Sequence, residues 1–135
     1  MSVTARFARR FRYLALLEAS LLVGAAYDLG FAALMVAAPG LPARLLHLPL
    51  PGQAFYLWIL ATLLAMLAAL YVLAARDPRR YSGVVAVAVA GRIAGALAFF
   101  AAALTGGGLS GLYPLAAADL GLGLSHALFW LPIRR

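Results

Sequence analysis

Residues 54–80, AFYLWILATLLAMLAALYVLAARDPRR, carry the clearest structural pattern in the chain. The first 22 residues of this stretch, 54–75, are almost entirely apolar. As a helix rising about 1.5 Å per residue, they are long enough to cross a hydrocarbon core of about 30 Å. The next five residues, 76–80, hold four charges and a proline, which stops a helix. The stretch therefore predicts a transmembrane helix followed by a charged turn.

Three more apolar blocks of similar length flank this stretch. The chain has 135 residues, of which 66% are hydrophobic, against roughly 45–50% in a soluble domain. A soluble fold of this size cannot bury so much apolar surface. We expect a single all-α domain, an integral membrane four-helix bundle with up-down-up-down connectivity. The expected spans are residues 13–38, 54–75, 82–104 and 112–131.

The first apolar block is expected to remain in the protein. Its apolar run is too long for a signal peptide and contains Glu18 and Asp28. The chain also lacks cysteine, which excludes disulfides, thiolate catalysis and Cys-ligated metal centres.

The arginines predict the orientation in the membrane. All 11 basic residues are arginines, and nine of them lie in three segments on the same side of a four-span chain. By the positive-inside rule, that side is the cytoplasm, and both termini lie there. The net charge of +7 then reflects topology and anionic lipid, not nucleic acid, and we expect a bacterial cytoplasmic (inner) membrane. The nine are Arg6, Arg9, Arg10, Arg12, Arg76, Arg79, Arg80, Arg134 and Arg135.

Two local patterns leave alternatives open. In residues 39–53, leucines alternate with Arg44 and His47, which fits either a short surface helix or an ordinary apolar loop. Small residues recur four apart at Gly91 and Gly95, and again at Ala117, Gly121 and Ser125. Such rows allow close helix packing, either within one chain or in a homo-oligomer.

The polar residues inside the spans are the candidate functional residues. Inserting an Asp or Arg at the centre of a span costs roughly 2.5–3.5 kcal/mol, whereas a Leu gains about 0.3–0.6. Such residues should therefore face the bundle interior and find partners there. From the helical rise, Asp28, Arg92, Asp119 and Thr62 lie at similar depths near the midplane, within roughly 5 Å of one another along the axis.

Glu18 and His126 are expected to form a second polar layer, roughly 7–10 Å nearer the cytoplasm. Asp119 and His126 are seven residues apart, so they share one helical face. The midplane layer holds two aspartates against one arginine. A proton, a cation or a polar ligand would balance this excess of negative charge, although the residues could also serve only to fix the helix register.

The sequence disfavours several other kinds of site. Gly106-x-Gly108-x-x-Gly111 matches the dinucleotide fingerprint in letters, but no βαβ unit surrounds it. His47 and His126 lie at different depths, which disfavours a bis-histidine haem, and no Glu-x-x-His pair suggests a di-iron site. We interpret the aromatic residues near the span ends as membrane-interface anchors. They are Tyr13, Tyr56, Tyr71, Tyr81, Tyr113 and Trp130.

The layout resembles the DoxX-like family of small bacterial four-helix membrane proteins. The resemblance lies in the four spans, the proline-bounded segment Pro39–Pro51 and the charged turn Ala75–Arg79. Members of that family include subunits linked to thiosulfate and quinone redox chemistry. The resemblance therefore implies the fold and favours a quinone-facing or lipid-facing role, but it supplies no catalytic motif.

Three functions lead on this basis, and an intramembrane enzyme with Glu18 and His126 as acid and base stays open without an indicated substrate. The first is a ligand-binding or redox-accessory protein whose polar core holds a quinone, an isoprenoid or a lipid. The second is a structural or assembly subunit of a larger membrane complex, and the third is proton or cation transfer. We expect no resident metal or cofactor, and the absence of a catalytic motif weighs against an enzyme.

Overall fold

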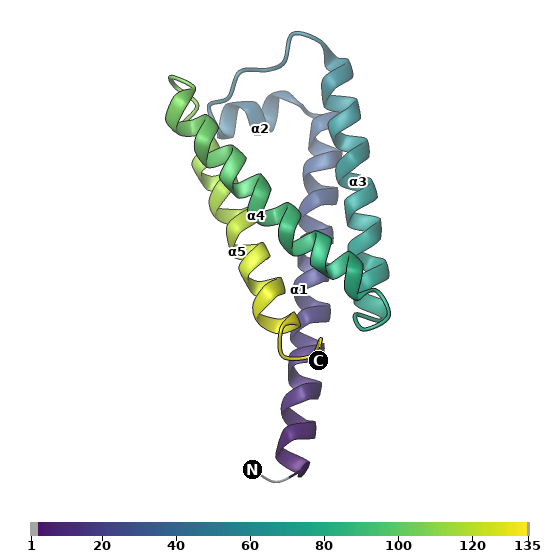
Figure 1. The fold of residues 1–135 in the computed structure, drawn as a ribbon. Helices are drawn as coiled ribbons and strands as arrows, with labels where there is room; N and C mark the ends of the chain where they lie inside the picture. The colour runs from purple at the N-terminus through teal and green to yellow at the C-terminus, as the bar shows by residue number, and fades with distance from the viewer. Residues whose placement is uncertain (1–2, 135) are drawn as a thin grey trace.

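The computed structural model describes the backbone of residues 3–134 and the side chains of residues 8–134. Arg135 and the side chain of Arg6, both used in the orientation argument, lie outside these ranges. Every regular element within the described backbone is a helix, which confirms the all-α prediction (Figure 1). The helices are α1 (Val3–Ala37), α2 (Gly40–Leu45), α3 (Ala54–Arg76), α4 (Ser82–Thr105) and α5 (Leu112–Trp130).

Four of these helices are long and apolar enough to cross a membrane: residues 8–37 of α1, and the whole of α3, α4 and α5. Their ends fall within one residue of the expected spans, except at the start of α1. There the helix extends back to Val3 through the arginine-rich segment. Arginine is a good helix former, and no glycine or proline interrupts residues 3–12, so nothing in the sequence stops the helix at the membrane boundary.

The links between helices follow from proline and glycine. Asp77 is extended, with φ −153° and ψ 84°, because the following Pro78 disfavours helical backbone at that position. Gly107 and Gly108 have φ of 40° and 108°, in the left-handed region that glycine enters without strain. These residues turn the chain between α3 and α4, and between α4 and α5.

The link between α1 and α3 contains the short helix α2, so the predicted short helix is present over residues 40–45 of the segment 39–53. The rest of this link, from Leu46, runs without regular structure to Gln53. The backbone carbonyl of Leu46 lies directly against Gly111, and no side chain would fit at that position. This contact joins the α2 link to the start of α5.

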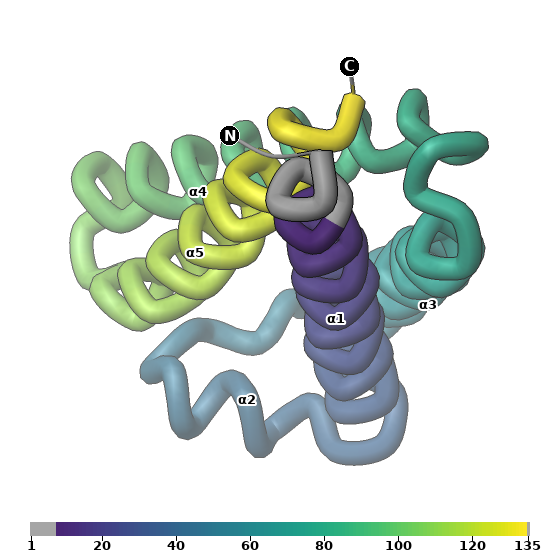
Figure 2. Tube along the Cα trace, turned by 90° about the horizontal axis from the view of Figure 1, so that it is seen from below, coloured from purple at the N-terminus to yellow at the C-terminus, as the bar shows by residue number. Residues whose placement is uncertain are grey.

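The long helices pack as two pairs. α1 lies along α3, α4 lies along α5, and α1 against α5 joins the pairs (Figure 2). α3 and α4 meet near the turn that connects them and separate beyond it (Figure 1). Many of the buried apolar residues are small, which lets the helices approach closely. The core cluster contains Leu17, Leu21, Ala25, Ala68, Tyr71, Ala74, Ala75, Val85, Ala88 and Ile133.

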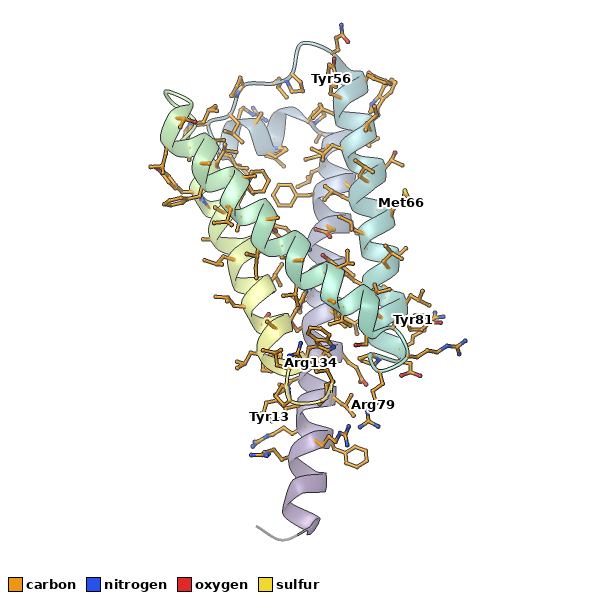
Figure 3. All side chains as sticks on the ribbon, in the orientation of Figure 1. Tyr13, Tyr56, Met66, Arg79, Tyr81 and Arg134 are labelled. Carbon is orange, nitrogen blue, oxygen red and sulfur yellow. The ribbon has the colours of Figure 1, made fainter. Side chains whose placement is uncertain are left out.

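Large apolar side chains also cover the outside of the helices. Trp58, Met66, Val87, Leu97 and Leu128 are all between 58% and 66% exposed. Figure 3 shows side chains such as Met66 pointing away from the helices. A soluble monomer rarely exposes contiguous apolar surface on this scale, whereas a helix bundle surrounded by lipid does so along its whole length.

Candidate functional site

Arg92 joins three helices in the interior of the molecule. Its Nη2 donates to Asp28 Oδ1 of α1 at 2.8 Å, and its Nη1 donates to Asp119 Oδ1 of α5 at 2.6 Å. Nη2 also donates to the backbone carbonyl of Gly24 in α1, at 3.3 Å. The Asp28 side chain is fully buried and that of Arg92 is 7% exposed. We call Asp28, Arg92 and Asp119 the charged cluster; the structure brings these three predicted residues together.

Two glycines set the distance between α4 and α5 around the charged cluster. A Cβ added at Gly95 of α4 would lie 2.9 Å from Asp119 Oδ2, closer than real Cβ contacts come. A Cβ at Gly123 of α5 would lie 3.0 Å from Cβ of Arg92. Larger residues at these positions would push the helices apart, so the glycines allow the short ion pair between Arg92 and Asp119.

Two tyrosine rings pack against the guanidinium of Arg92. Its Cζ lies 5.3 Å from the ring centroid of Tyr27 in α1 and 5.2 Å from that of Tyr71 in α3, within the range of cation–π attraction. Tyr71 is only 3% exposed, so its interpretation as an interface anchor is wrong. Its ring also meets the His126 ring edge-on, with centroids 5.8 Å apart, and so links the charged cluster to a second polar group.

That second group is a chain of hydrogen bonds between α1 and α5. Ser125 Oγ donates to the Leu122 carbonyl at 2.8 Å, and Ser20 Oγ lies 2.9 Å from Ser125 Oγ and 2.6 Å from His126 Nδ1. Each hydroxyl has only one proton. All three contacts are satisfied when Ser20 donates to Ser125 and His126 Nδ1–H donates to Ser20. This arrangement places a proton on Nδ1 of His126.

Three buried polar atoms in the described part of the chain have no hydrogen-bond partner. They are Asp28 Oδ2, Arg92 Nε and His126 Nε2. The first can accept a hydrogen bond and the second can donate one. Most buried polar atoms in proteins are paired, so the two unpaired atoms of the charged cluster, Asp28 Oδ2 and Arg92 Nε, indicate a place where a polar ligand group or a proton can be held.

A cavity of about 260 Å³ reaches the charged cluster from between α3 and α4. Asp28, Arg92, Asp119 and Tyr71 contribute the polar part of its lining. Leucines of α3 and small or apolar residues of α4, such as Gly91 and Val87, form most of the remainder. The cavity exists because α4 follows α5 away from α3 beyond their shared turn (Figure 1).

Two predicted site residues lie away from the charged cluster. Thr62 is exposed, and its hydroxyl donates to the Trp58 carbonyl of its own helix at 2.8 Å, so its side chain does not join the charged cluster. Its depth along α3 was similar to that of Arg92, but its side chain points to the outer face. Glu18 is partly exposed and makes no described hydrogen bond or ion pair with His126. Ser20, two residues later, contacts the histidine instead.

Metal-binding side chains do not gather at this site. Among residues 8–134, no group of three or more His, Asp or Glu side chains lies close enough to hold a metal ion. His47 is exposed after α2, with φ of 50°, whereas His126 is fully buried in α5. The described site presents charged groups, hydrogen-bonding groups and aromatic rings.

Comparisons with protein-family models, with curated proteins and with solved structures found no match for this chain. We therefore infer function from the site itself. Sequence reasoning did not identify Tyr27, Tyr71 or Ser20 as members of the site. Their spacing holds a partial indication, because Ser20, Gly24 and Tyr27 lie three or four residues apart on the face of α1 that carries Asp28.

Proposed function

We propose that this chain is a multi-pass protein of a bacterial cytoplasmic membrane that binds a lipid-soluble molecule with a polar end. The distribution of the arginines supports up-down-up-down spans with both termini in the cytoplasm. The candidate ligands are a quinone, an isoprenoid or a lipid, and the protein serves as a binding or redox-accessory protein. The resemblance to DoxX-like proteins favours the same class of ligand.

The observation that carries this proposal is the charged cluster at the wall of the cavity between α3 and α4. A molecule dissolved in the bilayer meets an apolar lining first and a guanidinium with two carboxylates beyond it. Arginine donates to a carbonyl or phosphate oxygen, and a carboxylate accepts from a hydroxyl. The site therefore holds both a hydrogen-bond donor and hydrogen-bond acceptors, which suits a ligand head with carbonyl or hydroxyl groups.

The size of the cavity limits what enters it. Its volume of about 260 Å³ lies below the roughly 300–1,000 Å³ of pockets that enclose a drug-sized molecule. The cavity accommodates a ring or headgroup, while a long isoprenoid or acyl tail stays among the lipids. A ligand of this shape, polar at one end and apolar along the rest, fits both the cavity and its opening between two membrane-spanning helices.

A cavity-filling substitution tests the proposal without touching a charge. Gly91 lines the cavity and has no atom within 4 Å of the position of a Cβ, so Gly91→Leu places its side chain in that space. Gly121→Leu is the matched control, because Gly121 is an exposed helical glycine with equally open surroundings, and it does not line this cavity. Both variants should fold, since neither added Cβ meets another group.

The measurement is native mass spectrometry of each protein released gently from its own membrane, with extraction and identification of bound small molecules. We expect the original chain and Gly121→Leu to retain a quinone, isoprenoid or lipid that Gly91→Leu loses by about tenfold or more, a difference of about 1.4 kcal/mol in binding. Equal retention in all three proteins would refute the cavity as the binding site. Co-purifying protein subunits with no small molecule would favour the assembly-subunit alternative.

A further inference from the structure

A separate pocket of about 250 Å³ lies at the end of the molecule where the α3–α4 turn, α1 and the C-terminal turn meet. Figure 3 shows Arg79 and Arg134 at this end. The pocket shares no lining residue with the cavity that reaches the charged cluster. Its lining draws on segments that are far apart in the sequence.

Three arginines, one from each segment, line this pocket: Arg10 of α1, Arg79 of the turn and Arg134 after α5. Arg10 Nη2 donates to the Ile133 carbonyl at 3.4 Å, which joins the start of α1 to the C-terminal turn. Arg134 lies over the Trp130 ring, with its Cζ 5.3 Å from the ring centroid. Both contacts hold the guanidinium groups near the pocket.

Among residues 8–134, no aspartate or glutamate lines the pocket. The nearest acidic residue in the sequence, Asp77, accepts from the backbone N–H of Arg80 at 3.1 Å and so caps its own turn. The pocket therefore attracts anions.

Ser82 adds a neutral donor to the pocket. Trp130 Nε1 donates to Ser82 Oγ at 3.3 Å, so the serine accepts there and its own proton remains available for another acceptor. Ser82 is also the first residue of α4, where the partial positive charge of the helix dipole favours an anion. These groups add short-range donors to the charge of the arginines.

We propose that this pocket binds the phosphate of an anionic phospholipid headgroup. Guanidinium groups pair with phosphate oxygens through two parallel hydrogen bonds, which several arginines converging on a single pocket can supply. The pocket also has the right depth, because α3 ends at Arg76, α4 begins at Ser82 and α5 ends at Trp130 beside it. Headgroups of one leaflet lie at this level when the helices cross a bilayer. This inference does not depend on what binds at Arg92.

Two double variants of equal charge test the pocket. Arg79→Gln with Arg134→Gln removes two arginines that line it, and Arg76→Gln with Arg80→Gln removes two exposed arginines of the same end that do not. Each full-length protein, in uncharged detergent, is titrated with phosphatidylglycerol, phosphatidylcholine and glycerol 3-phosphate. Native mass spectrometry counts the bound molecules, and circular dichroism confirms that both variants fold.

We expect the pocket variant to lose at least tenfold more affinity for phosphatidylglycerol than the control variant loses. Weak binding of glycerol 3-phosphate in all proteins assigns the site to a lipid. If glycerol 3-phosphate binds tightly and shows the same loss, phosphate recognition stands and the source is a soluble phosphate ester. Equal losses in the two variants, or equal binding of phosphatidylcholine and phosphatidylglycerol to the original chain, would overturn the proposal.

Discussion

Arg92 is the residue whose charge state and partners shape the interior of this protein. A buried guanidinium is costly unless carboxylates surround it, and here two of them accept from its two terminal nitrogens at 2.8 and 2.6 Å. With both carboxylates ionised, the cluster carries one negative charge in excess. The Asp28 oxygen that Arg92 does not reach, Oδ2, has no other partner in the described structure. Removing one negative charge from the cluster should therefore destabilise the protein less than removing its positive charge.

This asymmetry predicts different effects for Asp28→Asn and Arg92→Leu. Asparagine keeps an oxygen for the Arg92 hydrogen bond and leaves one positive and one negative charge, so we expect Asp28→Asn to change the free energy of unfolding by less than about 1.5 kcal/mol. Arg92→Leu leaves two buried carboxylates without a cation and should cost about 3–5 kcal/mol. Unfolding in mixed micelles of increasing SDS content measures both values. Similar losses for the two variants would contradict the argument from excess charge.

The sequence predicted which charged residues would meet, but it did not predict all of the uncharged residues that lie beside them. Depth along a helix placed Asp28, Arg92 and Asp119 at one level, and burial of charge then required them to pair. Depth alone misplaced Thr62, because a residue at the right level can still point outward and bond to its own helix. A serine or tyrosine in an apolar span is not costly enough to demand a buried partner, so Ser20 and Tyr71 gave no comparable indication.

At the scale of elements, two glycines that lie one turn apart in α4 have different structural roles. Gly95 faces α5, where its missing Cβ leaves space for the Asp119 carboxylate. Gly91 lines the open cavity and touches nothing within 4 Å of a Cβ position. Their four-residue spacing in the sequence suggests that both glycines pack against the same helix. Within the chain, only Gly95 of the two lies against another helix.

Alanine substitutions should separate these roles. Gly95→Ala forces the new methyl group against Asp119 Oδ2 and should destabilise the fold by about 1–3 kcal/mol. Gly91→Ala meets no neighbour, and replacing a helical glycine by alanine gains roughly 0.5–1 kcal/mol. Thermal unfolding of the two variants in the same detergent, followed by circular dichroism, provides the comparison. A destabilised Gly91→Ala would indicate that this glycine packs against another chain, as the homo-oligomer alternative requires.

The ends of the helices were easier to predict from the sequence than which helices pack against each other. Proline at 39 and 78 and the glycines at 106–108 interrupt helices through local backbone sterics, which act whatever the tertiary fold. Helix pairing depends on which faces meet, and hydrophobicity on nearly all sides of α3 and α4 leaves no apolar stripe to specify it. The cavity between α3 and α4 was therefore not predictable from the sequence, although its polar wall was.

At the scale of the whole molecule, the two candidate sites lie at different depths. The cavity reaches the charged cluster in the middle of the helices, whereas the arginine-lined pocket lies at the end where α3 and α5 finish. One short turn joins α3 and α4 at the end of the molecule that carries Arg10, Arg79 and Arg134, which we call the basic end, and the two helices separate beyond it (Figure 1). The same connection thus opens the cavity and places Arg79 in the pocket.

The orientation of this arrangement in the membrane is open to direct measurement. If the basic end faces the cytoplasm, green fluorescent protein fused after Arg80 or Arg134 should fluoresce, because it folds there and not after export. Alkaline phosphatase, which is active only outside the cytoplasm, should be active when fused after Gly52 or Gly107, in the links at the opposite end. Each site is tested with both reporters, so that every active fusion has an inactive counterpart. The reversed pattern would place both the termini and the arginine-lined pocket outside the cell, against the charge distribution of the chain.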